Sequence, residues 1–177
     1  MGLHRDLLEQ ATMLAMIDLR RPKQVNLRRS ISAAYYSLFH FLVDNACRAI
    51  IGSKHEQRGY RAILARAFVH GTMFKACSSY SGGQLPDAMI KPLLDGATRK
   101  YMIAKPIQEI AGLFRELQQK RHLADYALSE RFQRSEVLTL IDQVKTFMSA
   151  FEDLLITDDR HLFLVSLLAW KDMSGRG

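Results

Sequence analysis

A single uninterrupted helical pattern runs between Pro22 and Gly52. Apolar residues recur there at helical spacing, at Ile31, Tyr35, Leu38, Phe39, Leu42, Ala46 and Ile50. Asn26 is a suitable N-cap and Gly52 a suitable stop, so the pattern predicts one helix over 26–51. Small residues early in this segment let a neighbouring helix approach closely. The segment therefore predicts a long helix at the centre of a helical protein.

Helical periodicity continues through the rest of the chain, whereas the alternation typical of strands is absent. It predicts helices over 3–19, from Ser53 to about Phe68, and over 106–129, 135–155 and 157–172. Expected boundary signals are Arg20-Arg21-Pro22, a Ser53/Glu56 capping box, Pro106 in a first turn and Ser135 as an N-cap. Serine, glycine and proline over 78–98 predict an irregular insert with a short helical turn near Ala88. The expected fold is an all-α, antiparallel up-and-down bundle of about five to six helices.

Length and composition favour one domain over 1–177, with a core over 3–156 and an extra C-terminal helix over 157–172. The net charge of +7 favours an anionic partner such as RNA, although a solvated basic surface is the alternative. Cys47 and Cys77 have no metal-site spacing and are expected to be reduced, buried thiols of a cytoplasmic protein. The most apolar stretch, Leu162 to Trp170, is too short to cross a bilayer, so no membrane partner is expected.

Two motifs in the chain are similar to those of a known family. Residues 28–40 read RRSISAAYYSLFH, and residues 120–126 read KRHLADY. Their order and spacing in a helical chain resemble the HEPN family, in the branch with RRxISxAYYxxFH-like and RxxADY-like motifs. The resemblance covers about residues 3–156 and implies a bundle of four or five helices.

Many HEPN members are metal-independent endoribonucleases without cofactors, in which an Arg-x(4–6)-His motif from each chain meets at a dimer interface. The histidine handles the ribose 2′-OH proton and the arginine stabilises the phosphate charge. The resemblance thus implies a cytoplasmic, prokaryotic homodimer that acts on or binds RNA. It would belong to a toxin–antitoxin or defence system, with a nucleotidyltransferase-type antitoxin as its partner.

On this resemblance, the candidate catalytic residues are Arg121 with His122 or Asp125. Asp125 stands where the family histidine is expected, so the alternative is a noncatalytic RNA- or protein-binding module that has lost this histidine. A second register pairs Arg115 with His122, because six residues separate them and they share a helix face. Tyr35, Tyr36 and Tyr126 are the supporting residues.

Each of these residues also has a structural interpretation. Arg121 and Asp125 are spaced for an intrahelical ion pair, and Asp125 can accept a bond from helix 26–51. His122 fits an exposed position, and the paired tyrosines fit core or interface packing. Arg28, Arg29, Arg58 and Arg61 are candidate RNA-binding residues, for which a solvated rim is the alternative.

Overall fold

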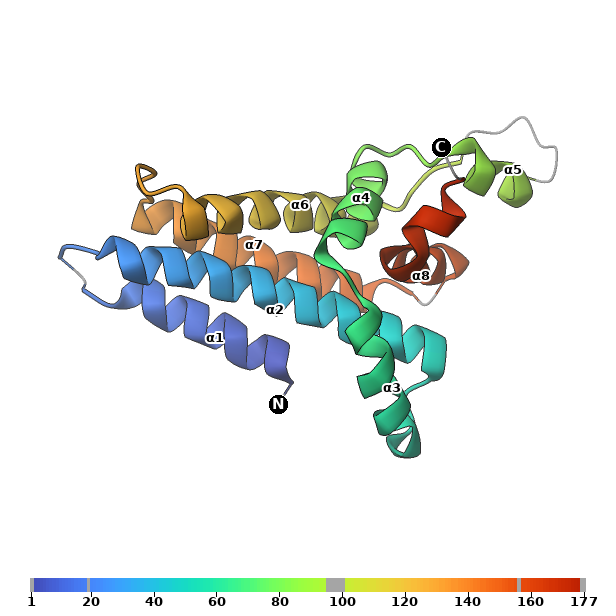
Figure 1. The fold of residues 1–177 in the computed structure, drawn as a ribbon, viewed down its shortest axis with the longest axis horizontal. Coiled ribbons are helices and arrows are strands. Elements are labelled where there is room, and N and C mark those ends of the chain that lie inside the picture. Colours follow the sequence, from blue (N-terminus) through green and yellow to red (C-terminus); the bar gives the residue numbers. More distant parts are fainter. Residues whose placement is uncertain (1, 19, 95–100, 156, 176–177) are drawn as a thin grey trace. The chain divides into compact units, whose positions relative to one another are not determined.

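The computed structural model describes residues 2–18, 20–94, 101–155 and 157–175, and all the regular structure in these ranges is helical (Figure 1). It contains eight α-helices and two short 3₁₀ helices: α1 Leu3–Met16, α2 Gln24–Ile51, η1 His55–Gln57, α3 Arg58–Leu64, η2 Ala65–Ala67, α4 His70–Ser81, α5 Asp87–Leu94, α6 Lys105–Tyr126, α7 Arg134–Asp153 and α8 Asp158–Met173. The predicted all-α bundle class is confirmed. Eight α-helices exceed the predicted five to six, because the segments around 70–94 fold into helices of their own.

The chain forms two compact units. Unit 1 comprises Met1–Phe41 and Leu113–Ala150, and unit 2 comprises Leu42–Gly112 and Phe151–Gly177. Unit 1 therefore contains α1, most of α2 and the adjoining parts of α6 and α7. Unit 2 contains α3, α4, α5 and α8 with the remaining turns of the longer helices.

In unit 1, small side chains on α2 allow α1 to pack closely. Ser30 is fully buried, and its hydroxyl donates to the Ala11 carbonyl at 2.7 Å. The Ser37 hydroxyl donates to the His4 carbonyl at 2.6 Å. A buried hydroxyl normally requires such a partner, and here the helix backbone of α1 provides it. The sequence predicted only that these small serines let a neighbouring helix approach closely. In the structure their hydroxyls also bond the backbone of α1 directly.

In unit 2, the core lies between α4 and α8. The Tyr80 ring packs edge-on against Phe163 at 4.9 Å between centroids, and both rings are buried. Ser166 donates to the Leu162 carbonyl at 2.6 Å, so the Tyr80 hydroxyl donates to Ser166 Oγ at 3.0 Å. Burial raises the pKa of Tyr80 to about 12.

The two cysteines also lie in unit 2. Cys47 on α2 and Cys77 on α4 are both buried thiols. Burial, and next the neighbouring Asp44 carboxylate, raise the pKa of Cys47 to about 11. At neutral pH the Cys47 side chain is therefore almost entirely a thiol.

The prediction of an irregular insert over 78–98 is wrong for most of its described part, 78–94, whereas the short helical turn expected near Ala88 is present as part of α5. Helix α4 continues to Ser81, and α5 occupies Asp87–Leu94, so only a short connection separates them. Residues 95–98 lie outside the described residues. The stripe that drives α4 is Met73, Ala76, Cys77 and Tyr80, all of which are buried.

Two predicted N-caps, Asn26 and Ser135, are also wrong. Helix α2 begins at Gln24, because the Lys23 carbonyl already accepts the Asn26 amide N–H at 3.0 Å. Helix α7 begins one residue before Ser135, and the Gln133 N–H bonds the Glu136 carboxylate at 3.2 Å. At α7 a polar side chain does cap the helix, with Gln133 two residues before the predicted cap.

The predicted helix from Ser53 to Phe68 is broken into η1, α3 and η2, and its capping residues differ. Gln57 Oε1 accepts the Lys54 N–H at 3.2 Å, a role that the sequence had suggested for the Ser53/Glu56 box. At α8 the expected start is confirmed, because the Thr157 hydroxyl accepts the Arg160 N–H at 3.3 Å. Pro106 lies in the first turn of α6, as predicted.

None of the described helices combines the length and apolar character that crossing a bilayer requires.

Candidate functional site

Arg28, a predicted RNA-binding residue, lies in unit 1 against the C-terminal end of α6. Its guanidinium donates to the Ala124 carbonyl at 2.7 Å, the Ala127 carbonyl at 2.8 Å and the Glu130 carbonyl at 2.7 Å. Longer bonds of 3.4 Å reach the Leu123 and Leu128 carbonyls. The last carbonyls of a helix lack intrahelical donors, and a cation there also complements the helix dipole. Arg28 therefore serves as a C-cap in the fold.

The predicted catalytic arginine, Arg121, lies on α6 over the tyrosine pair of α2. Its guanidinium carbon is 5.2 Å from the Tyr35 ring centroid and 6.0 Å from that of Tyr36. Tyr35 is fully buried and Tyr36 is half-buried. Stacking over aromatic faces stabilises a guanidinium and fixes its plane. Two of the predicted supporting residues, Tyr35 and Tyr36, thus lie beside Arg121.

Asp125 links Arg121 to α2. Its Oδ2 lies 3.4 Å from Nη1 of Arg121, in an ion pair whose side chains are 18% and 23% exposed. Its Oδ1 accepts the Ser32 hydroxyl at 2.9 Å. The intrahelical ion pair and the bond from α2 were both among the structural alternatives for Asp125. The carboxylate thus has two partners that hold it in place.

Buried polar atoms lie along the same face of α6. The Nε of Arg121 and the Oε1 of Gln118 are shielded from solvent, and the described residues provide neither with a hydrogen-bond partner. Residues three apart on a helix lie on one face, so these two groups are neighbours. Unsatisfied buried polar groups are costly, so this face of α6 carries an unfavourable contribution to the free energy of folding.

His122 and Tyr126 are exposed, and their rings contact each other at 4.9 Å between centroids. His122 follows Arg121 directly, so its side chain points about 100° away from that of Arg121. The structure therefore brings His122 to Tyr126, whereas Arg121 lies with Tyr35, Tyr36 and Asp125. Arg115, the alternative arginine, is half-buried on α6.

The remaining predicted RNA-binding arginines differ in their surroundings. Arg61 in unit 2 donates to the Gly52 carbonyl at 2.7 Å and the Lys54 carbonyl at 2.9 Å, and so closes the turn after α2. Arg29 and Arg58 are exposed. Of the adjacent pair on α2, Arg28 thus stabilises the fold and Arg29 faces solvent.

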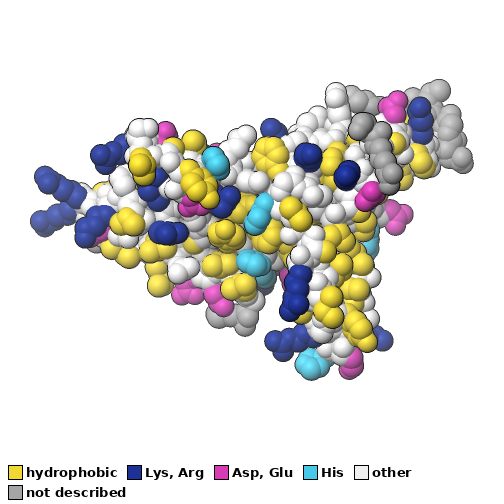
Figure 2. Space-filling view, viewed as in Figure 1, with side chains coloured by type: hydrophobic (Ala, Val, Ile, Leu, Met, Phe, Trp, Pro, Cys, Tyr) yellow, Lys and Arg dark blue, Asp and Glu magenta, His cyan; other side chains and the backbone are white. Residues whose placement is uncertain are grey.

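The α1–α2 turn of unit 1 carries a group of exposed cations that the site prediction missed. Arg20, Arg21 and Lys23 are exposed and line an open hollow together with Asp18. In Figure 2, Lys and Arg side chains gather at the left-hand end, where Figure 1 draws this turn. Asp18 has φ 58°, a left-handed conformation that side chains other than glycine rarely adopt.

Two sets of bonds fix this turn. Asp18 Oδ2 accepts the Asn26 side-chain amide at 3.0 Å, and Asp18 also pairs with Lys23 at 3.7 Å. Arg134 at the start of α7 donates to the Ala15 carbonyl at 2.9 Å and the Asp18 carbonyl at 2.7 Å. The turn is therefore held to α2 and to α7.

A fourth exposed cation, Arg131, precedes Phe132, whose backbone bonds the side chain of Gln24 at the start of α2. Gln24 Nε2 donates to the Phe132 carbonyl at 2.9 Å, and Gln24 Oε1 accepts the Phe132 N–H at 2.9 Å. Arg131 and Lys23 are each next in sequence to one member of this bonded pair. We call Arg20, Arg21, Lys23 and Arg131 the basic end of unit 1. The sequence signal was the Arg20-Arg21 pair before Pro22, which we had interpreted only as a helix stop.

No group of three or more His, Cys, Asp or Glu side chains within the described ranges is arranged to hold a metal ion.

These observations define the class of the protein. Its described residues form an all-helical fold with two compact units, and they contain no group of side chains arranged to hold a metal ion. No family model, no curated protein and no solved structure matches the chain. The HEPN resemblance stays a hypothesis that rests on the two sequence motifs.

Proposed function

We propose that this protein is a HEPN-like RNA-binding module that contacts the RNA backbone through the basic end of unit 1. The observation that carries the proposal is the exposed group of Arg20, Arg21 and Lys23 around one fixed turn, with the exposed Arg131 next in sequence to Phe132, which bonds Gln24 at the start of α2. Arginine and lysine side chains supply most of the affinity of proteins for phosphate backbones. The net charge of +7 acts in the same direction.

The backbone at the start of α2 favours the binding of an anion at the basic end of unit 1. The first turn of α2, which begins at Gln24, contains no acidic residue. A helix N-terminus carries a partial positive charge, so this end of α2 adds to the potential of the neighbouring arginines. The bonds of Asp18 and Arg134 limit the motion of the turn, which reduces the entropy lost when it binds RNA.

Fluorescence anisotropy with a short labelled single-stranded RNA tests the proposal across a salt series. The variant replaces Arg20, Arg21 and Arg131 by alanine. The control replaces three exposed lysines of unit 2, Lys75, Lys91 and Lys171, by alanine, so both variants lose the same charge. Because each single-strand phosphate contact contributes about −0.7 to the salt slope, the first variant should flatten the slope by about 2.

The control should keep the wild-type slope. Equal losses in the two triple variants would mean that only net charge matters and would refute the basic end as the RNA site. An absence of RNA binding by the wild type at low salt, across several RNA sequences, would refute the function itself. An added Arg58→Ala variant tests the unit 2 arginine that the sequence suggested.

A second candidate function is metal-independent RNA cleavage by a homodimer, with Arg121 and either His122 or Asp125 as the catalytic groups. The observation in its favour is the position of Arg121, which is held over two rings beside shielded polar atoms while His122 is exposed next to it. The bonds of Asp125 to Ser32 and Arg121 favour the noncatalytic alternative, because they give this carboxylate a structural role.

Cleavage assays in EDTA separate these two functions. An active enzyme should lose cleavage in Arg121→Ala and in His122→Ala but retain it in Lys120→Ala, a neighbouring charge on the same helix. No cleavage of several RNAs by the wild type would remove the nuclease. A monomeric mass at micromolar concentration would exclude a composite dimer site. Co-purification of a nucleotidyltransferase-type partner would support a cytoplasmic toxin–antitoxin role.

A further inference from the structure

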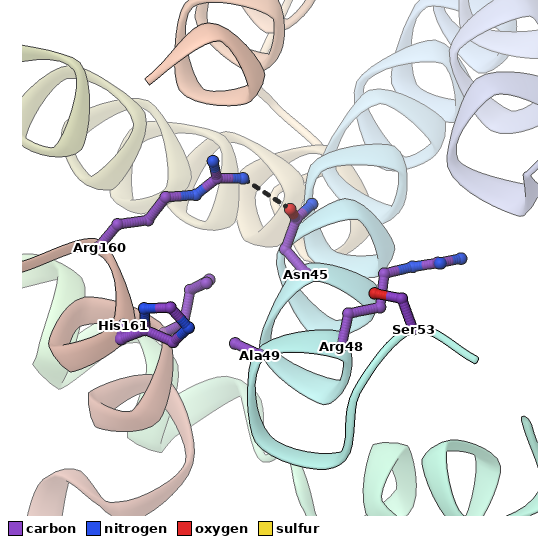
Figure 3. A pocket seen from close by; sticks show the side chains of 7 residues that line it. Asn45, Arg48, Ala49, Ser53, Arg160 and His161 are labelled. Atoms are coloured by element: carbon purple, nitrogen blue, oxygen red, sulfur yellow. Dashed lines mark hydrogen bonds between the residues drawn. The ribbon is translucent and has the colours of Figure 1, made fainter. Parts of the chain in front are cut away.

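A small pocket in unit 2 lies between the C-terminal part of α2 and the start of α8. Its volume is about 280 Å³, and its lining is Asn45, Arg48, Ala49, Ser53, Arg160, His161 and Leu164. In Figure 3, Arg160 and His161 of α8 lie opposite Asn45 and Ala49 of α2. Five of the seven lining residues bear polar side chains, and three of these are basic. None of these residues belongs to the basic end of unit 1.

Arg160 provides a fixed positive charge to this pocket. It donates to the Leu154 carbonyl at 2.7 Å and to Asn45 Oδ1 at 3.1 Å (Figure 3), and its guanidinium carbon lies 4.7 Å from the Phe151 ring centroid. Both acceptors are neutral, and none of the ion pairs formed by the described residues involves Arg160. A guanidinium has five N–H donors, of which these two bonds use two.

The pKa of Arg160 reflects the partial removal of its guanidinium from water. Burial lowers the pKa of Arg160, while the Glu152 carboxylate at longer range acts in the opposite direction. An arginine stays charged at physiological pH even when it is partly buried. A partly desolvated cation whose bonded partners are neutral attracts an anion more strongly than a solvated one does.

Two further basic residues, Arg48 and His161, line the same pocket, and in Figure 3 the Arg48 guanidinium points away from Arg160. The His161 Nδ1 lies 3.2 Å from the Thr157 carbonyl, so Nδ1 carries a proton and donates to that carbonyl. When the ring takes up a second proton, Nε2 becomes a donor as well and can bond an anion. Arg48 pairs with Asp44 at 2.7 Å, which orients its guanidinium and leaves it partly exposed at the rim. The Ser53 hydroxyl lines the same rim. Together these groups offer donors from several directions, as an oxyanion with several oxygens requires.

We propose that this pocket binds the phosphate group of a small phosphorylated molecule. Arg160 holds the phosphate by charge-assisted hydrogen bonds, Arg48 adds positive charge at the rim, and the protonated His161 imidazole donates from Nε2 to a phosphate oxygen. The small volume suits a phosphate with little beyond a short sugar or alkyl group attached. This site is separate from the proposed RNA contact, and its ligand is a free small molecule.

Isothermal titration of the full chain tests the proposal with inorganic phosphate and with ribose 5-phosphate, against potassium chloride at matched ionic strength. The variants are Arg48→Ala and His161→Ala, which remove groups at the rim and wall. The control is Lys171→Ala, an exposed cation on the same helix α8. Each pocket variant should weaken binding about tenfold, because each removes a charge-assisted bond. The control should bind as the wild type does.

Tighter binding of ribose 5-phosphate than of phosphate would support a phosphate monoester as the ligand, and equal binding would support free phosphate. No heat of binding for either compound up to about 10 mM would overturn the proposal. Equal weakening by Lys171→Ala would also overturn it, because the effect would then reflect general charge. Urea midpoints within the wild-type range would confirm that each variant is folded.

Discussion

Replacing Arg28 by alanine should destabilise unit 1 more than replacing any of its exposed arginines by alanine does. Its guanidinium makes three bonds of 2.8 Å or shorter to backbone carbonyls at the end of α6. It also lies 5.5 Å from the Phe132 ring centroid. Both kinds of contact are lost together in the alanine variant.

The magnitude follows from the environment of these groups. The contacts are partly exposed, so each short bond contributes about 0.5–1 kcal/mol net, and water can reach the carbonyls in the variant. The ring contact and the helix dipole together add about 1 kcal/mol. Because such terms are not additive, we expect a loss of about 3 kcal/mol in the free energy of unfolding.

The adjacent Arg29 provides a matched control, because it is exposed and lies on the same helix. Arg29→Ala should change the free energy of unfolding by less than about 0.5 kcal/mol. Urea unfolding followed by circular dichroism measures both variants, and the m-value checks that the transition stays cooperative. A loss below about 1 kcal/mol for Arg28→Ala, or equal losses in both variants, would refute the capping role.

Other contacts predict effects of different kinds. Ser166→Ala leaves the buried Tyr80 hydroxyl without its acceptor and should lower the free energy of unfolding by about 2 kcal/mol in urea titrations. Asp125→Asn weakens the ion pair with Arg121 and should cost only about 0.5 kcal/mol in the same assay. Tyr80, whose pKa of about 12 exceeds the unfolded value of 10, should make the protein less stable as pH rises from 10 to 12, as measured by thermal unfolding. Burial, and next His4, lower the pKa of His40, so the unfolded chain binds its proton more readily and stability should fall as pH drops below 6.5. His40→Asn should flatten that acid limb of the thermal unfolding profile.

Each of these predictions would be contradicted by a specific result. A neutral Ser166→Ala variant would mean that water reaches the Tyr80 hydroxyl. A loss above about 2 kcal/mol in Asp125→Asn would show that the carboxylate is more buried than its 23% exposure indicates. Absorbance titration that ionises every tyrosine near pH 10 would contradict the shielding of Tyr80. An unchanged acid limb in His40→Asn would assign that limb to other groups.

Periodicity predicted the long helices well because their apolar stripes are continuous. It missed α4 and the full extent of α5, because glycine, serine and proline over 78–98 predicted an irregular insert with only a short helical turn near Ala88. The buried spacing of Met73, Ala76, Cys77 and Tyr80 was already a helical signal there. Packing against α8 outweighs the weak helix propensity of the serines in α4, as tertiary contacts often do. Pro92 lies inside α5, which is only eight residues long, although proline normally disrupts the interior of a helix.

The candidate site was predicted in part. Helical spacing alone indicated that Arg121 pairs with Asp125, and that pair is present. Nothing in the adjacent arginines at 28 and 29 could show which of them bonds the carbonyls of α6, because these carbonyls lie about 100 residues away in the sequence. The reciprocal bonds of Gln24 with Phe132 are similarly long-range, so the position of Arg131 beside α2 could not be inferred.

The two cysteines can report local opening of one unit alone. Both Cys47 and Cys77 belong to unit 2, and unit 1 contains no cysteine. With a pKa of about 11, roughly one Cys47 side chain in ten thousand is a thiolate at pH 7. Alkylation in the native state is therefore slow, and its rate follows the fraction of time that unit 2 is open. A thiol reagent thus measures fluctuations around the Arg160 pocket of unit 2 without a signal from the basic end of unit 1.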